Sequence, residues 1–266
     1  MSSADPAAFP TLWKENVSMD DRNRSMKMCG KLGIVAMLLV GLMSCELGAD
    51  EGGILVFTHS FDFSKEQGDW IVDFSDFPAT NTDSIDYELK TAYTDRPDNL
   101  GANLKSIMIS GNNHSDDLFM FMKRRITGLS PNTDYAIVFE VELASNAPKG
   151  SVGIGGSPGE SVFLKAGAIG MEPKAVIDDS QHVLNVDKGN QASSGESVVT
   201  LGDIAVAPYT DRYALITRTN SGSQSPFIAR ANSKGELWLI VGTDSGFEGV
   251  TTVYYTRVNV IFSTAN

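Results

Sequence analysis

The sequence predicts an all-β fold, an antiparallel β-sandwich or jelly roll with few and short helices. From Ile54 onward, short apolar or alternating runs follow one another, separated by Gly, Pro, Asn, Asp and Ser. Those residues favour turns, so the pattern indicates strands joined by short connections. No segment keeps a 3.6-residue apolar period for three turns, which argues against long helices. The expected strands are Ile54–Phe57, Trp70–Phe74, Ile85–Leu89, Leu104–Ser110, Leu118–Met122, Tyr135–Leu143, Val162–Ala166, Val183–Val186, Val198–Leu201, Tyr213–Arg218, Phe227–Arg230, Leu237–Val241 and Thr252–Phe262.

Two of these runs show which side of each strand faces a core. In Ile137–Leu143 every odd-numbered residue is apolar, whereas Glu140 and Glu142 occupy the other face. In Val258–Phe262 the even-numbered residues are apolar and Asn259 lies opposite them. Successive strand residues point to opposite faces, so each run predicts one buried and one polar surface. Nothing between Ile54 and Phe262 reads as a linker, and we expect one domain over residues 54–266.

The N-terminal part of the chain has the pattern of an export signal. Basic residues in Met26–Lys31 precede the apolar run Leu32–Met43. That run reaches roughly 18 Å as a helix, too short for a hydrocarbon core of ~30 Å. Residues 26–44 therefore predict a cleaved signal peptide rather than a membrane span. Residues 1–25 carry four acidic residues, unlike a signal, and we interpret them as a non-native or mis-started extension before Met26.

The end of this signal resembles the lipobox of bacterial lipoproteins. The tetrad is Leu42-Met43-Ser44-Cys45, and Cys29, the only other cysteine, lies inside the signal. The resemblance implies that Cys45 becomes the lipidated first residue, with residues 45–53 as a tether. Because Glu46 rather than Asp follows it, the resemblance further implies an outer-membrane or cell-surface location. The alternative is an ordinary secretory signal in which Cys45 is incidental.

The charge of the mature chain restricts its partners. Removing residues 1–44 removes five Lys or Arg and four Asp or Glu, which changes the net charge from −12 to −13. So acidic a surface repels phosphate backbones and argues against nucleic-acid binding. Its carboxylates suit calcium, which prefers oxygen ligands. We expect contact with the membrane through the lipid only.

Three further stretches suggest a family. They are Phe61-Asp62-Phe63-Ser64 with Gly68-Asp69-Trp70, the turn Gly128-Leu129-Ser130-Pro131-Asn132-Thr133-Asp134-Tyr135, and the closing run Tyr254–Val260. Together they resemble jelly-roll, galactose-binding-like domains, the group that contains many carbohydrate-binding modules. The resemblance implies that the last strand returns beside the first and that the domain binds a glycan. It covers the strand pattern of residues 57–262 but no ligand motif.

Polar loops between the strands supply the candidate binding residues. Asn, Asp and Ser oxygens before the run Leu118–Met122 are suited to calcium or a sugar, although their spacing is not that of an EF-hand. The alternative is a hairpin loop whose side chains bind local backbone groups. Phe247, at a loop tip, is a candidate for stacking on a sugar ring. The candidate ligand-binding residues are Asn112, Asn113, His114, Asp116, Asp117 and Phe247, and the candidate metal ligands are Asp187, Asn190, Asp244 and Glu248.

Other patterns give weaker signals for chemistry. The Gly-rich segment Gly153–Glu160 lacks the Gly-Lys-Ser/Thr of a phosphate-binding loop, and we interpret it as a loop. Glu140 and Glu142 lie about 6.7 Å apart along one strand face, a spacing compatible with glycoside hydrolysis. Exposed structural carboxylates would show the same pattern. Trp70 and Trp238 lie within apolar runs and are expected in the core.

Three functions follow from these observations. The first is a surface-anchored lipoprotein whose jelly-roll domain binds a glycan, with calcium as a stabilising ion. The second is a structural or protein-interaction lipoprotein of the envelope. The third is a carbohydrate-active enzyme, a glycanase or lyase that uses Glu140 and Glu142 or acidic residues of the loops. No hydrolase signature such as Gly-x-Ser-x-Gly or His-Glu-x-x-His occurs, so binding is favoured over catalysis.

Overall fold

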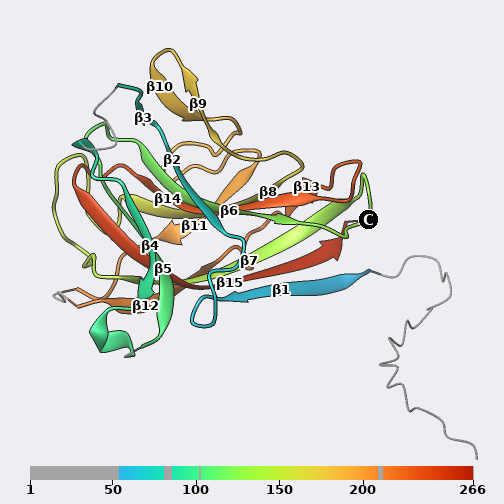
Figure 1. Cartoon of the computed structure of the whole chain (residues 1–266), viewed down its shortest axis with the longest axis horizontal. Helices are drawn as coiled ribbons and strands as arrows, with labels where there is room; N and C mark the ends of the chain where they lie inside the picture. Colours follow the sequence, from blue (N-terminus) through green and yellow to red (C-terminus); the bar gives the residue numbers. More distant parts are fainter. Residues whose placement is uncertain (1–53, 81–85, 102, 209–211, 266) are drawn as a thin grey trace, which may run out of the picture. The chain divides into compact units, whose positions relative to one another are not determined.

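Two antiparallel β-sheets face each other in the computed structural model, which describes residues 54–80, 86–101, 103–208 and 212–265 (Figure 1). Every pairing between the strands is antiparallel, so the predicted all-β sandwich is confirmed. Sheet A consists of β1 (Val56–Asp62), β4 (Lys90–Asp95), β5 (Lys105–Asn112), β7 (Asp134–Ser145), β12 (Ala214–Thr219), β13 (Phe227–Arg230) and β15 (Val250–Thr264). Sheet B consists of β2 (Ile71–Ser75), β6 (Leu118–Ile126), β8 (Val162–Ile169), β11 (Val198–Asp203) and β14 (Leu237–Ser245).

The inner faces of the two sheets form the main hydrophobic core. On β7 the odd-numbered residues from Ile137 to Leu143 are at most 1% exposed, as the alternation predicts, whereas Glu140 is exposed. On β15 the even-numbered residues Val258, Val260 and Phe262 are fully buried. Sheet B contributes its own inner residues, which pack against those of sheet A in one continuous cluster. They include Leu118, Met120, Met122, Leu164, Ala166, Leu239 and Val241.

The first and last strands of the described chain are neighbours. β1 pairs with the second half of β15, with Phe61 opposite Val258 and Phe57 opposite Phe262. β5 pairs with the first half of β15, so β1 and β5 lie end to end along one side of it. In Figure 1 β1 runs along the margin of sheet A beside β15. The return of the last strand beside the first is therefore confirmed, and β1 is an edge strand.

A smaller sheet lies beside sheet B. It is formed by β3 (Phe77–Pro78), β9 (Ala175–Asp178) and β10 (Gln181–Leu184), and the β9–β10 hairpin projects beyond sheet B in Figure 1. A second apolar cluster sits on the outer face of sheet B, where Phe119 and Phe121 of β6 stack at 5.2 Å. Because these rings are fully buried, sheet B is covered on both faces at this end.

Several expected boundaries need correction. The expected strand Ile85–Leu89 is wrong over residues 86–89, since the strand begins at Lys90, and Ile85 lies outside the described residues. β9 was not expected, and β10 is displaced from the expected Val183–Val186. The 3₁₀ helix η1 (Asp98–Leu100) lies between β4 and β5. Trp70 is 3% exposed in the core, but Trp238 is only half-buried and lies on the outer face of sheet B.

The expectations for the N-terminus lie outside the described residues. These are the extension 1–25, the signal 26–44, Cys45 and the tether 45–53, and they stay predictions. No helix in the part of the chain that the structure describes is long and apolar enough to cross a membrane.

Phe139 gives a test of the core between the sheets. It is fully buried and its ring lies 5.6 Å from that of Phe227. Phe139→Ala should lower the free energy of unfolding by about 3–5 kcal/mol, because it removes apolar contacts and leaves a cavity. Urea denaturation followed by tryptophan fluorescence measures the change. The matched control is Val138→Ala on the opposite face of β7, for which we expect about 1 kcal/mol or less. Equal losses for the two variants would contradict the assignment of faces.

Candidate functional site

The loops singled out in the sequence meet at one end of sheet B. Phe119 of β6 lies opposite Asp244 of β14, which brings Asp117 close to Asp244. The ammonium group of Lys188 lies between them, with Nζ 2.9 Å from Asp244 Oδ2 and 3.5 Å from Asp117 Oδ1. Asp76 Oδ2 approaches the same Nζ at 3.2 Å. The carboxylates that were candidate metal ligands and sugar contacts here thus surround a lysine.

Lys165 is the second cation of this buried charge cluster, which comprises Lys165, Lys188, Asp76, Asp117 and Asp244. Lys165 and Asp244 are both fully buried, and Lys165 Nζ lies 3.0 Å from Asp244 Oδ2. The same Nζ donates hydrogen bonds to the carbonyl oxygens of Lys188 at 2.8 Å and Ser193 at 2.9 Å. Because β8 and β14 are neighbouring strands, this pair ties the 185–197 segment to the middle of sheet B.

The two oxygens of Asp244 have unequal surroundings. Oδ2 accepts from Lys165, from Lys188 and from the backbone N–H of Gln191 at 2.9 Å. Oδ1 is buried and has no hydrogen-bond partner in the protein. A buried polar atom without a partner costs about 1–3 kcal/mol and is rare in native proteins. The lack of a partner at Oδ1, beside three donors at Oδ2, therefore needs a physical explanation.

Burial and repulsion shift the pKa values in this cluster. Burial lowers the pKa of Lys165 despite the attraction of Asp244. Burial also disfavours charge on Lys188, but Asp244, Asp76 and Asp117 outweigh it and raise the pKa of Lys188 to about 12. Burial, with repulsion from Asp244 and Asp76, raises the pKa of Asp117 to about 6. Burial raises the pKa of Asp76 as well. Lys188 is therefore the more firmly held cation.

The remaining candidate metal ligands do not join this cluster. Asp187 accepts backbone N–H groups of Gly189 and Glu196, each at 2.8 Å, and these bonds lower the pKa of its carboxyl. The carbonyl of Asn190 accepts from the N–H of Ser193, and the N–H of Glu248 donates to Ile154. Across the described ranges, no group of three or more His, Cys, Asp or Glu is arranged to hold a metal ion. Calcium binding stays a prediction.

The candidate glycan contacts near β6 connect loops to one another. Asn113 is buried and donates from Nδ2 to the carbonyls of Ser245 and Phe247, at 2.8 and 3.0 Å. His114 Nε2 lies 3.2 Å from the carbonyl of Asp86. The Phe247 ring is half-buried and packs so closely on Gly153 that a methyl group there would overlap it.

The rest of that candidate loop behaves in the same way. Asn112 Nδ2 donates to Glu88 Oε1 at 3.2 Å, and the carbonyl of Asp116 accepts from Gln191. One bond in this loop is local, from the Ser115 N–H to Asn113 Oδ1 at 3.1 Å, whereas the contacts above join segments far apart in the chain.

Glu140 and Glu142 lie on the outer face of sheet A, where neighbouring strands bind them. Glu140 accepts from Asn259 Nδ2 at 3.0 Å. Glu142 lies 2.7 Å from Arg257 Nη2 and accepts from Thr256 Oγ1 at 2.7 Å. Both carboxylate oxygens of Glu142 thus have partners on β15, as expected of a structural carboxylate.

A solvent-open cleft lies at the other end of sheet B, where the two sheets part. We call it the edge cleft. It is formed by the end of β1, the turn 63–70 and Arg124 of β6, and it encloses about 410 Å³. β2 stops pairing with β6 at Ile71 opposite Lys123, which leaves Arg124 at the open margin of the sheet. No expected site residue lies here.

Aromatic rings follow β1 along this margin. Phe57, His59 and Phe61 alternate with polar residues, share the inner face of the strand and are only half-buried. The rings of His59 and Phe61 stack 6.2 Å apart, and Phe57 and His59 line a separate hollow of about 380 Å³. Burial, reinforced by Arg124, lowers the pKa of His59, which favours the neutral ring. The row thus places three half-buried rings along this margin.

Arg124 and Trp70 line the edge cleft beside Phe61. The Arg124 guanidinium lies 4.7 Å from the centre of the Phe61 ring, within cation–π range, and its Nη2 lies 3.3 Å from Asp69 Oδ2. Phe61 meets the Trp70 ring edge to face at 5.3 Å. The Nε of Arg124 and the Nε1 of Trp70 are buried behind the cleft surface, with no partner in the protein.

One signal in the sequence could have located the edge cleft. The run Phe57-Thr58-His59-Ser60-Phe61 alternates rings with small polar residues, the pattern of a strand with one aromatic face. The alternation predicts a strand with an aromatic face. The partial exposure of these rings, however, depends on β1 being an edge strand. That fact belongs to the topology and not to the local sequence.

Comparison with known proteins gives only distant likenesses. No protein-family model and no curated protein sequence matches the chain significantly. Among solved structures, a putative sugar-binding protein from Bacteroides thetaiotaomicron is 12% identical, with a TM-score of 0.37 over 74% of this chain and 90% of that one. The carbohydrate-binding module TmCBM27, studied for mannan recognition, is 12% identical, with a TM-score of 0.34 over 81% of this chain and 100% of that one.

A third likeness is to part of a much longer protein. Tailspike protein 4 of bacteriophage CBA120 is 10% identical, with a TM-score of 0.31 over 74% of this chain, which spans 20% of the tailspike's length. At such TM-scores and identities, these structures say nothing about the ligand of this chain.

Asp117 predicts a specific pH dependence. Its folded pKa of about 6 lies above the ordinary 3.8, so the folded state binds its proton more tightly than the unfolded state does. This tighter proton binding adds to the free energy of unfolding. The added stability is fully present below pH 3.8 and is lost as the pH rises through about 6. Asp117→Asn should therefore flatten the stability profile over this window. Urea unfolding at several pH values measures the difference, and parallel profiles for the two proteins would refute the assignment.

Proposed function

We propose that the domain binds a glycan in the edge cleft. The observation that carries the proposal is that the half-buried ring of Phe61 lines one open cleft together with the side chains of Arg124 and Trp70. Ligand sites combine apolar walls with a few convergent polar groups, and this cleft has both. Sugars present C–H faces that pack on aromatic rings and hydroxyls that accept hydrogen bonds.

Polar side chains around the edge cleft suit the same ligand. Asp62, Lys65, Glu66 and Gln67 line it beside Phe61. Carboxylate and amide oxygens accept hydroxyl protons, whereas Lys65 donates. Hydroxyl-rich ligands need donors and acceptors together, and the turn 63–70 supplies both around an aromatic face.

The proposal places this domain at a cell surface. A lipid on Cys45, with residues 45–53 as a tether, would hold the glycan-binding domain outside the cell. The lipobox-like tetrad Leu42–Cys45, the apolar run before it and the absence of other cysteines after residue 45 support this. Calcium remains a proposed stabilising ion, and binding with and without a chelator will test it.

Phe61 provides the decisive test of glycan binding. Affinity gel electrophoresis of the full chain against a panel of soluble polysaccharides should show retardation by at least one. Phe61→Leu keeps an apolar side chain but loses the flat ring, so affinity should fall by roughly 30-fold, the effect of removing about 2 kcal/mol at an aromatic anchor. Phe61→Tyr keeps the ring and should retain binding.

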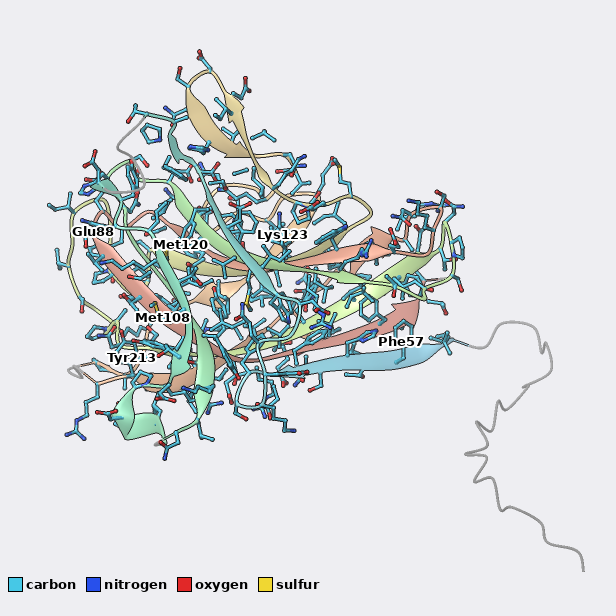
Figure 2. All side chains as sticks on the ribbon, viewed as in Figure 1. Phe57, Glu88, Met108, Met120, Lys123 and Tyr213 are labelled. Atoms are coloured by element: carbon cyan, nitrogen blue, oxygen red, sulfur yellow. The ribbon has the colours of Figure 1, made fainter. Side chains whose placement is uncertain are left out.

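The control for this series is Tyr213→Leu. Tyr213 is a half-buried aromatic residue whose ring meets Tyr254 at 5.1 Å, and Figure 2 shows it at the opposite end of the molecule from Phe57 of β1. Its replacement should leave glycan affinity unchanged. Thermal unfolding verifies that each variant is folded. Failure of the wild-type chain to bind any polysaccharide, or equal affinity of Phe61→Leu, would overturn the proposal.

The anchor has an independent test. In a bacterial host that processes lipoproteins, the wild-type chain should sediment with membranes and incorporate labelled fatty acid. Cys45→Ala removes the thiol that would carry the lipid, so the label should be lost and the chain should leave the membrane fraction. Cys29→Ala is the matched control and should behave as wild type. Membrane association of Cys45→Ala equal to that of wild type would refute lipidation.

A further inference from the structure

The buried charge cluster contains an amine and a carboxyl group in position to react. Lys165 and Asp244 are both fully buried, lie on neighbouring strands and approach to 3.0 Å. Two ions are seldom buried so deeply, because each loses its hydration. The carboxyl group is also incompletely satisfied, since Oδ1 has no hydrogen-bond partner. A simple ion pair leaves this oxygen unexplained.

We propose that Lys165 and Asp244 are joined by an intramolecular isopeptide bond between Nζ and Cγ. The bond is an amide, so it replaces two buried ions by one neutral group. The amide therefore avoids the free-energy cost of keeping two charges away from water. The bond would form once, as the protein folds, and would covalently link β8 to β14 in the middle of sheet B.

The surroundings of Asp244 determine which oxygen leaves. Oδ2 accepts hydrogen bonds from the Lys188 ammonium and the Gln191 N–H, both at 2.9 Å. These two donors form a site that stabilises negative charge on Oδ2 while Nζ attacks Cγ. Oδ2 is thus the oxygen that remains as the amide carbonyl. Oδ1, which nothing holds, departs, and its lack of a partner is then explained.

The step balances without any further reagent. Lys165 begins as an ammonium group with three protons and Asp244 as a carboxylate. One ammonium proton first moves to the carboxylate, which leaves Nζ as a neutral amine with a lone pair and Asp244 as a carboxylic acid. Nζ then attacks Cγ, and the bond from Cγ to Oδ1 breaks. A second proton leaves Nζ, both protons depart with Oδ1 as water, and the third stays on the amide nitrogen. No oxidation or reduction occurs.

The reacting amine is Lys165 rather than Lys188, although both lie close to Asp244. Three carboxylates surround Lys188 and raise its pKa to about 12, so it keeps its proton and serves as the charge that polarises Asp244. Burial lowers the pKa of Lys165, which favours the neutral, nucleophilic amine. The amide N–H retains an acceptor in the carbonyl of Lys188.

Peptide mapping of the denatured full chain tests the bond. Mass spectrometry of a protease digest should show a branched peptide that contains Lys165 and Asp244, with a mass one water below the sum of the two linear peptides. Lys165→Arg keeps a positive charge but has no primary amine, so this variant should give only linear peptides. Lys188→Met keeps both reacting groups and should reduce the branched fraction at least tenfold, because it removes the positive charge at Oδ2.

Lys123 is an internal control within the same digest. It is also a buried lysine, with its Nζ 2.9 Å from Glu172 Oε1, but that carboxylate is 45% exposed. Its peptides should be linear. Complete recovery of linear peptides for Lys165 and Asp244 in the wild-type chain would overturn the proposal. A branched peptide that joins Lys188 to Asp244 would equally overturn it, because the wrong amine would have reacted.

Discussion

The carboxyl group of Asp244 holds together segments that are far apart in the chain. It receives Lys165 from β8, Lys188 and Gln191 from the 185–197 segment, and through Lys188 it is linked to Asp76 and Asp117. Breaking a buried pair by removing one partner costs about 3–5 kcal/mol, since the other charge stays buried. The arrangement of the loops at this end of sheet B therefore depends on one residue.

The sequence predicted the central strands because their side chains obey a local rule. In β7 and β15 one face is buried in the core, so alternation alone identifies both strand and face. β4 was not predicted because none of its side chains is fully buried. Lys90 and Thr91 are exposed and Tyr93 is only half-buried. β9 is short and has two exposed residues of four, so it carries no alternation that a sequence reading would detect.

The sequence identified polar loop residues but not their arrangement, and the reason is physical. Asp117 and Asp244 meet because Phe119 of β6 lies opposite Asp244 of β14. What composition did not show is that Lys188 would supply the positive charge at their centre, because its distance in sequence from Asp76 and Asp244 hides the contact. Trp238 was expected in the core because its neighbours are apolar. It faces outward instead, since Leu237 and Leu239 take the inner face of β14.

The two ends of sheet B thus differ in their side chains, with a charge cluster at one end and an open cleft at the other. Strand β6 runs between them. At its beginning, Asp117 and Phe119 lie among buried charges and rings that leave little freedom to move. At its end, Arg124 lines an open cleft beside the half-buried ring of Phe61. Rigid scaffolds commonly carry binding groups at open margins, because ligands need access while the supporting strands must stay fixed.

The absence of cysteine after Cys45 sharpens this contrast. Domains outside the cell often gain stability from disulfides, which restrict the unfolded chain. Residues 46–266 contain no cysteine, so a disulfide within that part of the chain is impossible. A Lys165–Asp244 amide would impose the same kind of constraint by different chemistry. It would need no oxidant, and reducing conditions would not break it. The amide would join two central strands of sheet B, β8 and β14, near the end of the sandwich opposite the edge cleft. It would fix that end, and the aromatic residues of β1 would remain free to adjust to a ligand.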